Sequence, residues 1–276
     1  MRRRRMERFV AAVVQMSSGG DRAANVRRAG ALVRAAAERG ARLVVLPEVF
    51  AWRGTDVNDP SAAETVPGPT TATMSALARD LGIFLCMGSI LEAVTGQARR
   101  YNTSCVADPS GALVATYRKM HLFDVELPGR VAVRESATRL AGDAPVVVPT
   151  ALATLGCSIC YDLRFPELYR RLARDGAEVL LVPSAFTRPT GAAHWDVLCR
   201  ARAIENQCYL LAANQTGRSP HGHDDHGNSM IVDPWGTVVA RADDGEGIAT
   251  AELDGAHLAR VRQELPALAH RRLPPA

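Results

Sequence analysis

Residues 155–167 read LGCSICYDLRFPE. The apolar run in this stretch ends at Cys160, and polar and charged residues, among them Asp162 and Arg164, follow at once. This pattern predicts a strand that ends at a thiol and passes directly into a helix. A helix N-terminus with nearby cations lowers a cysteine pKa from about 8.5 into the range of roughly 3.5 to 7.5, and the thiolate is the reactive form. We therefore expect Cys160 to be exposed to substrate and to act as a nucleophile in covalent catalysis.

Strands and helices alternate along the chain on both sides of this stretch. Residues 9–15, 21–39 and 42–46 form one strand–helix–strand unit, and the second half repeats the scheme. Several runs, such as residues 179–182, lack polar alternation, as expected of strands covered on both faces. The pattern predicts an α/β sandwich. The expected helices are 21–39, 70–81, 166–174 and 193–207, and the expected strands are 9–15, 42–46, 83–88, 104–107, 113–118, 153–160, 178–183, 209–213, 229–232, 237–240 and 248–251, with a hairpin turn at 233–236.

Length and composition favour one large domain. The chain has 276 residues, of which 47% are hydrophobic and 22% charged, enough for a substantial core. Nothing in the middle resembles a linker. We expect a flexible basic extension over residues 1–8, a single domain over residues 9–265 and a C-terminal tail over residues 266–276. The tail either packs against a partner subunit or frays, and translation starts at Met1 or Met6.

The charge of the chain argues against a nucleic-acid partner. The four arginines at positions 2–5 equal the whole formal net charge of +4, so the body of the protein is balanced. The apolar residues 9–14 are too few for a signal peptide, and no run of about 18 apolar residues predicts a membrane span. Six cysteines in core-like runs favour a reducing cytoplasm.

Two further ionisable residues stand where they can meet Cys160. Glu48 directly follows the apolar run 43–47, and Lys119 ends the strand at 113–118. In α/β folds the carboxyl ends of strands build the site. A cysteine nucleophile needs a base to take its proton and a group to stabilise the oxyanion, and these two side chains are candidates.

Three segments carry a family resemblance. In chain order they are Leu46-Pro47-Glu48, residues 118–124 (RKMHLFD) and residues 160–168 (CYDLRFPEL). As an ordered set over nearly the whole length they resemble the signatures of the nitrilase, or carbon–nitrogen hydrolase, superfamily. The resemblance implies a four-layer α-β-β-α sandwich. It also implies that Glu48 is the general base, Lys119 binds the oxyanion and Cys160 is the nucleophile.

The resemblance extends to the rest of the site and to the reaction. It implies that Glu135 is a supporting acid that positions Lys119 and the attacking water, and that the backbone amide of Tyr161 completes the oxyanion hole. Glu48 would deprotonate Cys160, the thiolate would attack an amide carbonyl, the amine would leave and water would hydrolyse the thioester. No metal or organic cofactor is implied. The resemblance also implies a homodimer or higher homo-oligomer.

Within the superfamily, residues 121–129, 183–187, 193–195 and 200–207 resemble the deaminated-glutathione amidase branch. The implied substrate is a small α-keto acid with a terminal amide, here deaminated glutathione cleaved to 2-oxoglutarate and cysteinylglycine. The ω-amidases, which act on α-ketoglutaramate, share much of this framework and stay as an alternative, as does a nitrilase or carbamoylase. A catalytically silent binding protein is the non-enzyme alternative, and the intact set of Glu48, Lys119 and Cys160 argues against it.

Residues 49–54 (VFAWRG) match neither branch, and because they follow Glu48 we expect them to shape the pocket. An anionic substrate needs cations. Arg53, Arg130 and Arg188 lie near the motifs, and for each of them a solvated surface position is an equally good interpretation.

Other residues invite a functional interpretation. Cys157 and Cys160 form a C-x-x-C, but residues three apart in a strand lie about 10 Å apart and point to opposite faces, so Cys157 is expected in the core. The loop 220–227 holds His221, His223 and His226, yet a Gly-rich loop fixes no tetrahedral geometry, so we expect a hydrated loop at the pocket mouth. His121 and His194 are expected in structural or pocket-wall roles.

Overall fold

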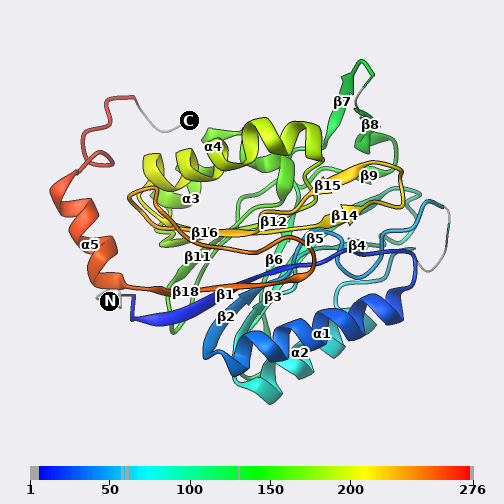
Figure 1. The fold of residues 1–276 in the computed structure, drawn as a ribbon, viewed down its shortest axis with the longest axis horizontal. Coiled ribbons are helices and arrows are strands. Elements are labelled where there is room, and N and C mark those ends of the chain that lie inside the picture. Colours follow the sequence, from blue (N-terminus) through cyan, green and yellow to red (C-terminus); the bar gives the residue numbers. More distant parts are fainter. Residues whose placement is uncertain (1–5, 57–58, 60–61, 130, 274–276) are drawn as a thin grey trace.

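Four layers of secondary structure make up the molecule. The computed structural model describes residues 6–56, 59, 62–129 and 131–273. Two β-sheets stack face to face; helices α1 (Arg22–Glu38) and α2 (Pro69–Leu81) cover the outside of one, and α3 (Pro166–Arg174) and α4 (Arg188–Asn206) cover the outside of the other (Figure 1). The four-layer α-β-β-α sandwich predicted from the sequence is confirmed.

The first sheet is built mainly from the N-terminal half and closed by a late strand. Its order is β18-β1-β2-β3-β5-β4, with β6 and β9 also pairing with β5. The central strands β1, β2 and β3 run parallel, which puts their carboxyl ends at one edge. The strands are β1 (Phe9–Gln15), β2 (Ala41–Val45), β3 (Phe84–Cys86), β4 (Ile90–Glu92), β5 (Arg100–Ala107), β6 (Leu113–Arg118), β9 (Arg139–Leu140) and β18 (Gly247–Leu253).

The second sheet has the order β10-β11-β12-β13-β16-β17, with β11, β12 and β13 parallel. Its strands are β10 (Val147–Pro149), β11 (Thr154–Cys157), β12 (Val179–Ser184), β13 (Tyr209–Asn214), β16 (Met230–Val232) and β17 (Val238–Arg241). The remaining elements are the strand pairs β7 (Asp124–Leu127)–β8 (Val131–Arg134) and β14 (Thr216–Arg218)–β15 (Asp224–His226), the 3₁₀ helices η2 (Glu135–Ala137) and η3 (Cys160–Arg164), and α5 (Gly255–Glu264).

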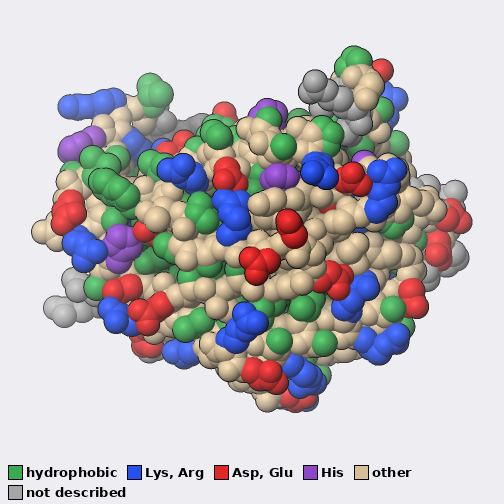
Figure 2. All heavy atoms as spheres, in the orientation of Figure 1, with side chains coloured by type: hydrophobic (Ala, Val, Ile, Leu, Met, Phe, Trp, Pro, Cys, Tyr) green, Lys and Arg blue, Asp and Glu red, His purple; other side chains and the backbone are tan. Residues whose placement is uncertain are grey.

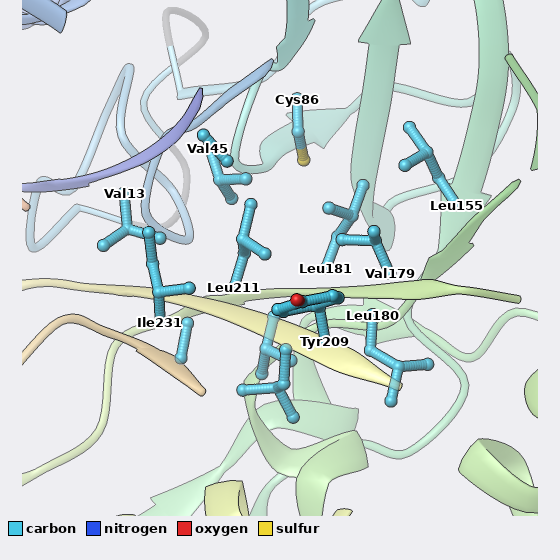
Figure 3. Packing of buried hydrophobic residues seen from close by; sticks show 14 of the residues in the cluster. Val13, Val45, Cys86, Leu155, Val179, Leu180, Leu181, Tyr209, Leu211 and Ile231 are labelled. Carbon is cyan, nitrogen blue, oxygen red and sulfur yellow. The ribbon is translucent and has the colours of Figure 1, made fainter. Parts of the chain in front are cut away.

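The main core lies between the two sheets. Val13, Val45 and Cys86 of the first sheet point toward Leu181 and Leu211 of the second (Figure 3), and all of them are fully or almost fully buried. Alternate residues of the same strands, such as Leu180, point away toward the helices. Strands with both faces covered read as unbroken apolar runs, which explains why residues 179–182 show no polar alternation.

A second core lies between the first sheet and its helices. Ala29, Val33 and Ala36 form the buried stripe of α1, with Met74 and Leu77 on α2. The α1 N-terminus is capped by Asp21, whose side chain accepts a hydrogen bond from the Ala24 N–H. The prediction of helix 21–39 came from the periodic spacing of the apolar stripe on α1.

Several element boundaries differ from the prediction. The strand expected at 153–160 ends at Cys157, because Ser158 and Ile159 already lead into η3. Helix α4 starts at Arg188 rather than 193, with Pro189 in its first turn, where proline costs no intrahelical hydrogen bond. Within the loop expected at 220–227, residues 224–226 form the short strand β15, and α5 was not predicted at all.

Contacts at both chain ends bear on the predicted extension and tail. Met6 is buried, the Glu7 N–H donates to the Leu152 carbonyl, and Arg8 donates to the Asp254 carboxylate at 2.8 Å. Residues 6–8 therefore pack on the domain, while residues 1–5 of the predicted extension lie outside the described residues. In the predicted tail, residues 266–273 form turns and bends, and Leu273 is highly exposed.

The surface carries mixed charge. Basic and acidic side chains are interspersed over the face in Figure 2, with no large patch of one sign. In the part of the chain that the structure describes, no helix is both long and apolar enough to cross a membrane.

Candidate active site

Cys160 sits on a sharp turn between β11 and α3. It opens η3 with a φ of 47°, a left-handed conformation that is rare outside glycine and marks a functional constraint. Asp162 holds the turn. Its fully buried carboxylate accepts hydrogen bonds from the Ile159 N–H at 2.8 Å and from the Tyr117 hydroxyl at 2.7 Å.

The same carboxylate also fixes the segment that follows Lys119. Asp162 Oδ1 accepts from the backbone N–H of His121 at 3.0 Å and lies 2.7 Å from His121 Nδ1. His121 stacks on Phe165 with ring centroids 3.7 Å apart. One buried acid thus ties together the second and third sequence motifs, and His121 has the structural role expected of it.

Glu48 stands three residues beyond the end of β2. Its backbone is clamped by the second sheet, since its N–H donates to the Ser184 carbonyl and its carbonyl accepts from Gln215 Nε2 at 2.8 Å. Val49 next to it has a φ of 49° and donates its N–H to Ser89 Oγ. Gly88, with a φ of 55°, lies so close to the Pro47 carbonyl that a Cβ at this position would overlap it.

Lys119 joins the two acids. Its ammonium lies 3.0 Å from Glu48 Oε1 and 2.9 Å from Glu135 Oε2, and its side chain is only 2% exposed. Asn102 of β5 donates to the same Glu48 oxygen at 2.8 Å, and the Phe123 N–H donates to Glu135 Oε2 at 2.7 Å. The Cys160 thiol hydrogen-bonds Glu48 and receives the backbone N–H of Ala185. The structure therefore brings all four predicted side chains into one cluster.

Burial and charge set the protonation states of this cluster. Burial raises the pKa of the Cys160 thiol well above its ordinary value, and the charge of Glu48 raises it further, which outweighs the opposing effect of Lys119. Burial alone lowers the pKa of Lys119, but the carboxylates of Glu135 and Glu48 outweigh it and raise that pKa well above the ordinary value. The pKa of Glu135 is lowered although burial opposes this, because Lys119 and the Phe123 N–H favour its charged form.

Burial and the charge of Glu48 therefore oppose the thiolate that a helix start and nearby cations led us to expect. Cys160 is 9% exposed but lines the cavity, as expected of a residue that meets the substrate, and it lies near both an anion and a cation. It is held as a neutral thiol beside Glu48, an acceptor placed to take its proton. The arrangement suits nucleophilic catalysis in which deprotonation accompanies attack.

The cluster opens into a cavity of about 620 Å³. Val49, Trp52, Arg53 and Gly54 line it, so the expectation that residues 49–54 shape the pocket is confirmed. Further lining comes from Phe123, Arg134, Thr138, Arg139, Tyr161, Arg164, Ala185, Phe186, Thr187, Thr190, His221, Gly222 and His223.

The predicted cations divide into three groups. Arg53 is buried and pairs with Asp225 through both guanidinium nitrogens, one of them 3.0 Å from Oδ1. Arg188 is exposed at the start of α4 and does not line the cavity, and Arg130 lies outside the described residues. His194, also exposed, lies 3.1 Å from Arg164 through Nδ1.

The other residues considered as functional candidates lie in the core or at the cavity wall. Cys157 is buried in the core at the end of β11, and all six cysteines are free thiols. His221 and His223 lie at the cavity wall, as expected for the mouth of the pocket. Across the described ranges, no group of three or more His, Cys, Asp or Glu side chains is placed to hold a metal ion.

Comparison with known proteins shows which family has this active-site arrangement. The carbon–nitrogen hydrolase family model matches residues 10–263. The chain belongs to the carbon–nitrogen hydrolase family. The resemblance read from three motifs is confirmed, and with it the reaction class: the chain is an enzyme that hydrolyses carbon–nitrogen bonds of amides.

Several individual members of the family are similar to this chain over nearly its whole length. Deaminated glutathione amidase of Synechocystis sp. is 42% identical over 269 residues, which cover 96% of this chain and 99% of the relative. Omega-amidase NIT2-A of Xenopus laevis is 39% identical over 267 residues, covering 97% and 96%. The crystal structure of the C. elegans NitFhit protein superposes with a TM-score of 0.90 at 38% identity, and the match covers 98% of this chain and 66% of that chain.

Sequence reasoning missed three contributors to the site. Asn102 carries no recognisable signal, because it is one polar residue inside a strand. Asp162 lay within the quoted motif, and its position two residues after the cysteine at a helix start was the available sign that it caps the turn. Arg139 follows Glu135 by four residues in a segment with no periodicity, and only the fold brings it to the cavity.

Proposed function

We propose that this enzyme hydrolyses deaminated glutathione to 2-oxoglutarate and cysteinylglycine through a thioester on Cys160. The observation that carries the proposal is the cluster of Cys160, Glu48, Lys119 and Glu135 in the wall of a cavity that arginines also line. The name of the 42% identical relative supports the substrate.

The first stage follows from the contacts of the thiol. Glu48 accepts the Cys160 proton as the sulfur attacks the amide carbonyl of the substrate. Negative charge develops on the carbonyl oxygen, and the Lys119 ammonium and the backbone N–H of Tyr161 stabilise it. The Tyr161 N–H lies in the first turn of η3, where N–H groups lack intrahelical partners. Glu48 then donates its proton to the leaving nitrogen, the C–N bond breaks and the amine departs.

The second stage reuses the same base. Glu48 takes a proton from a water molecule, which attacks the thioester carbonyl. Collapse of the tetrahedral intermediate breaks the C–S bond, and the thiolate regains a proton from Glu48 as the acid leaves. Glu135 contacts Lys119 at 2.9 Å, so its role is to position and keep charged the ammonium that serves both stages.

The cavity matches an anionic substrate. Arg139 and Arg164 line it half-buried, and neither has a carboxylate within ion-pair distance among the described residues. Deaminated glutathione carries two carboxylates, one on the keto-acid end and one on glycine. Guanidinium groups bind carboxylates through paired hydrogen bonds, so two such arginines suit a dianion.

An ω-amidase acting on α-ketoglutaramate is the second candidate, favoured by the 39% identical relative. The deciding experiment measures release of 2-oxoglutarate from both compounds, with Cys160→Ala as the control. Preference for deaminated glutathione, with an inactive variant, supports the proposal, and preference for α-ketoglutaramate assigns the chain to the second function. Turnover of a nitrile without amide activity would point to a nitrilase, and full activity of Cys160→Ala would refute the mechanism.

The proposal includes a homodimer or higher homo-oligomer and a cytoplasmic location. Val197 and Ile204, 66% and 44% exposed, are seven residues apart on α4, so they share a face. Trp235, 58% exposed, adjoins Gly236, where an added Cβ would overlap the Ile204 side chain. Such apolar surface favours a subunit contact. Light scattering of the purified protein tests this: a dimer mass lost in Trp235→Arg supports it, and a monomer contradicts it. Free thiols at all six cysteines suit a reducing compartment.

A further inference from the structure

Arg139 is a cation in the cavity wall, and none of the described acidic side chains forms an ion pair with it. It opens β9, whose pairing with β5 at Arg100 fixes its backbone, and its side chain is half-buried. Its Nη1 donates to the hydroxyl of the neighbouring Thr138 at 2.9 Å and to the Thr138 carbonyl at 3.3 Å. The other N–H groups have no hydrogen-bond acceptor within the described part of the chain. A guanidinium with donors left over, facing a cavity, is placed to bind an anion.

Two other cations of the wall are already paired with acids. Lys119 lies between Glu48 and Glu135, and Arg53 is held by Asp225. Arg139 acts favourably on the charge of Glu135, but Lys119 and the Phe123 N–H already share the Glu135 oxygen nearest to them. The charge of Arg139 is therefore available to a ligand.

The position of Arg139 relative to the acids tells which end of a substrate it meets. It directly follows Thr138, which ends η2 and donates its N–H to the Glu135 carbonyl, and the Glu135 carboxylate contacts the Lys119 ammonium that also pairs with Glu48. Arg164 instead lies over the rings of Tyr161 and Phe186, 5.8 and 5.4 Å from their centroids. Glu48 must deliver a proton to the leaving nitrogen, so the leaving group lies on the side of Glu48 and Arg139.

We propose that Arg139 binds the carboxylate at the far end of the leaving group, which in deaminated glutathione is the carboxylate of glycine. This inference rests on the proposed function and names the residue that separates its two candidate substrates. α-Ketoglutaramate releases ammonia and has no carboxylate on that side. Arg139 therefore selects peptide-like amides over the simple amide, by a charge-assisted contact that only the longer substrate makes.

The test is a binding cycle in the Cys160→Ala protein, where turnover does not interfere. Deaminated glutathione and its C-terminal carboxamide differ only in the charge of the group that Arg139 would contact. Calorimetry measures the affinity of both ligands for Cys160→Ala and for Cys160→Ala with Arg139→Met. We expect Arg139→Met to weaken binding of the acid by roughly 10- to 100-fold and binding of the carboxamide by less than about threefold.

A second variant guards against a folding artefact. Arg139→Lys keeps the charge without the planar fork, and it should recover part of the affinity for the acid while leaving the carboxamide unchanged. Equal weakening of both ligands by Arg139→Met, or no weakening of either, overturns the assignment. Failure of the proposed function looks different: the wild-type chain then releases no 2-oxoglutarate from deaminated glutathione, whatever the binding cycle gives.

Discussion

Replacing Lys119 by methionine removes the ammonium and keeps most of the aliphatic volume. The side chain is 2% exposed, and its charge is the only one within ion-pair distance of both Glu48 and Glu135 among the described residues. In the variant, Glu48 and Glu135 therefore lose the cation that lies between them. One of them must take up a proton, or both must stay charged without a partner.

The magnitude follows from these contacts. Removing one partner of a buried ion pair costs about 3–5 kcal/mol of stability, because a buried charge is left uncompensated. The Asn102 amide at 2.8 Å from Glu48 and the Phe123 N–H at 2.7 Å from Glu135 remain, so we expect the lower end, about 3 kcal/mol. Separately from this loss of stability, loss of the Lys119 contact to the oxyanion should reduce kcat by a factor of about 10² to 10³.

Stability and catalysis are separated by a second variant, Lys119→Met with Glu135→Gln, in which the unpaired charge next to the lost cation is gone. Urea denaturation should show about half of the lost stability restored, whereas release of 2-oxoglutarate should stay at the level of the single variant. Recovery of turnover in the double variant would refute the reasoning, since it would mean that Lys119 serves only to neutralise Glu135. Near-native activity of Lys119→Met alone would also contradict it.

Three further predictions concern the scaffold of the site. Glu48→Gln removes a negative charge that raises the pKa of Cys160, while the Lys119 cation stays, so the pKa of Cys160 should fall. Alkylation of Cys160 by iodoacetamide should then reach its half-maximal rate at lower pH than in the wild type. A pH profile moved to higher pH contradicts this. Asp162→Asn should cost roughly 1–3 kcal/mol in urea denaturation and lower kcat, because an amide cannot accept from every donor that this carboxylate serves; an unchanged kcat speaks against its role in holding the Cys160 turn. Gly88→Ala should lower both stability and kcat, because the new Cβ overlaps the Pro47 carbonyl beside Glu48. The matched control is Gly82→Ala, at a similar φ but with open space around it. It should lower the free energy of unfolding by only about 1 kcal/mol and leave kcat unchanged.

The parts of the fold that could be predicted are those with long-range pattern. Residues 179–182 and the stripe of Ala29, Val33 and Ala36 are long enough for periodicity to show, and the structure has them as β12 and α1. The missed elements are short or polar. Strand β15 reads Asp-Asp-His, and its strand conformation comes from backbone pairing with β14 and with Thr187, which the local sequence does not reveal.

The site was predictable in its members but not in its electrostatics. Chain order and strand ends pointed to Glu48, Lys119 and Cys160, which follow β2 and β6 of the first sheet and β11 of the second, and the stacking of the two sheets brings them together. The raised pKa of Cys160 depends on burial and on contact with Glu48, and neither can be read from a sequence. Arg139 shows the same limit, since its place in the cavity depends on the pairing of β9 with β5.

The central claim is that Cys160 carries the acyl group of the substrate. Mixing the enzyme with deaminated glutathione, quenching with acid within the first turnover and measuring the intact mass tests it most directly. The account predicts a mass increase equal to one 2-oxoglutaryl group, located by digestion on the peptide that holds Cys160 and absent in Cys160→Ala. Turnover without any adduct, or an adduct that survives in Cys160→Ala, would contradict it.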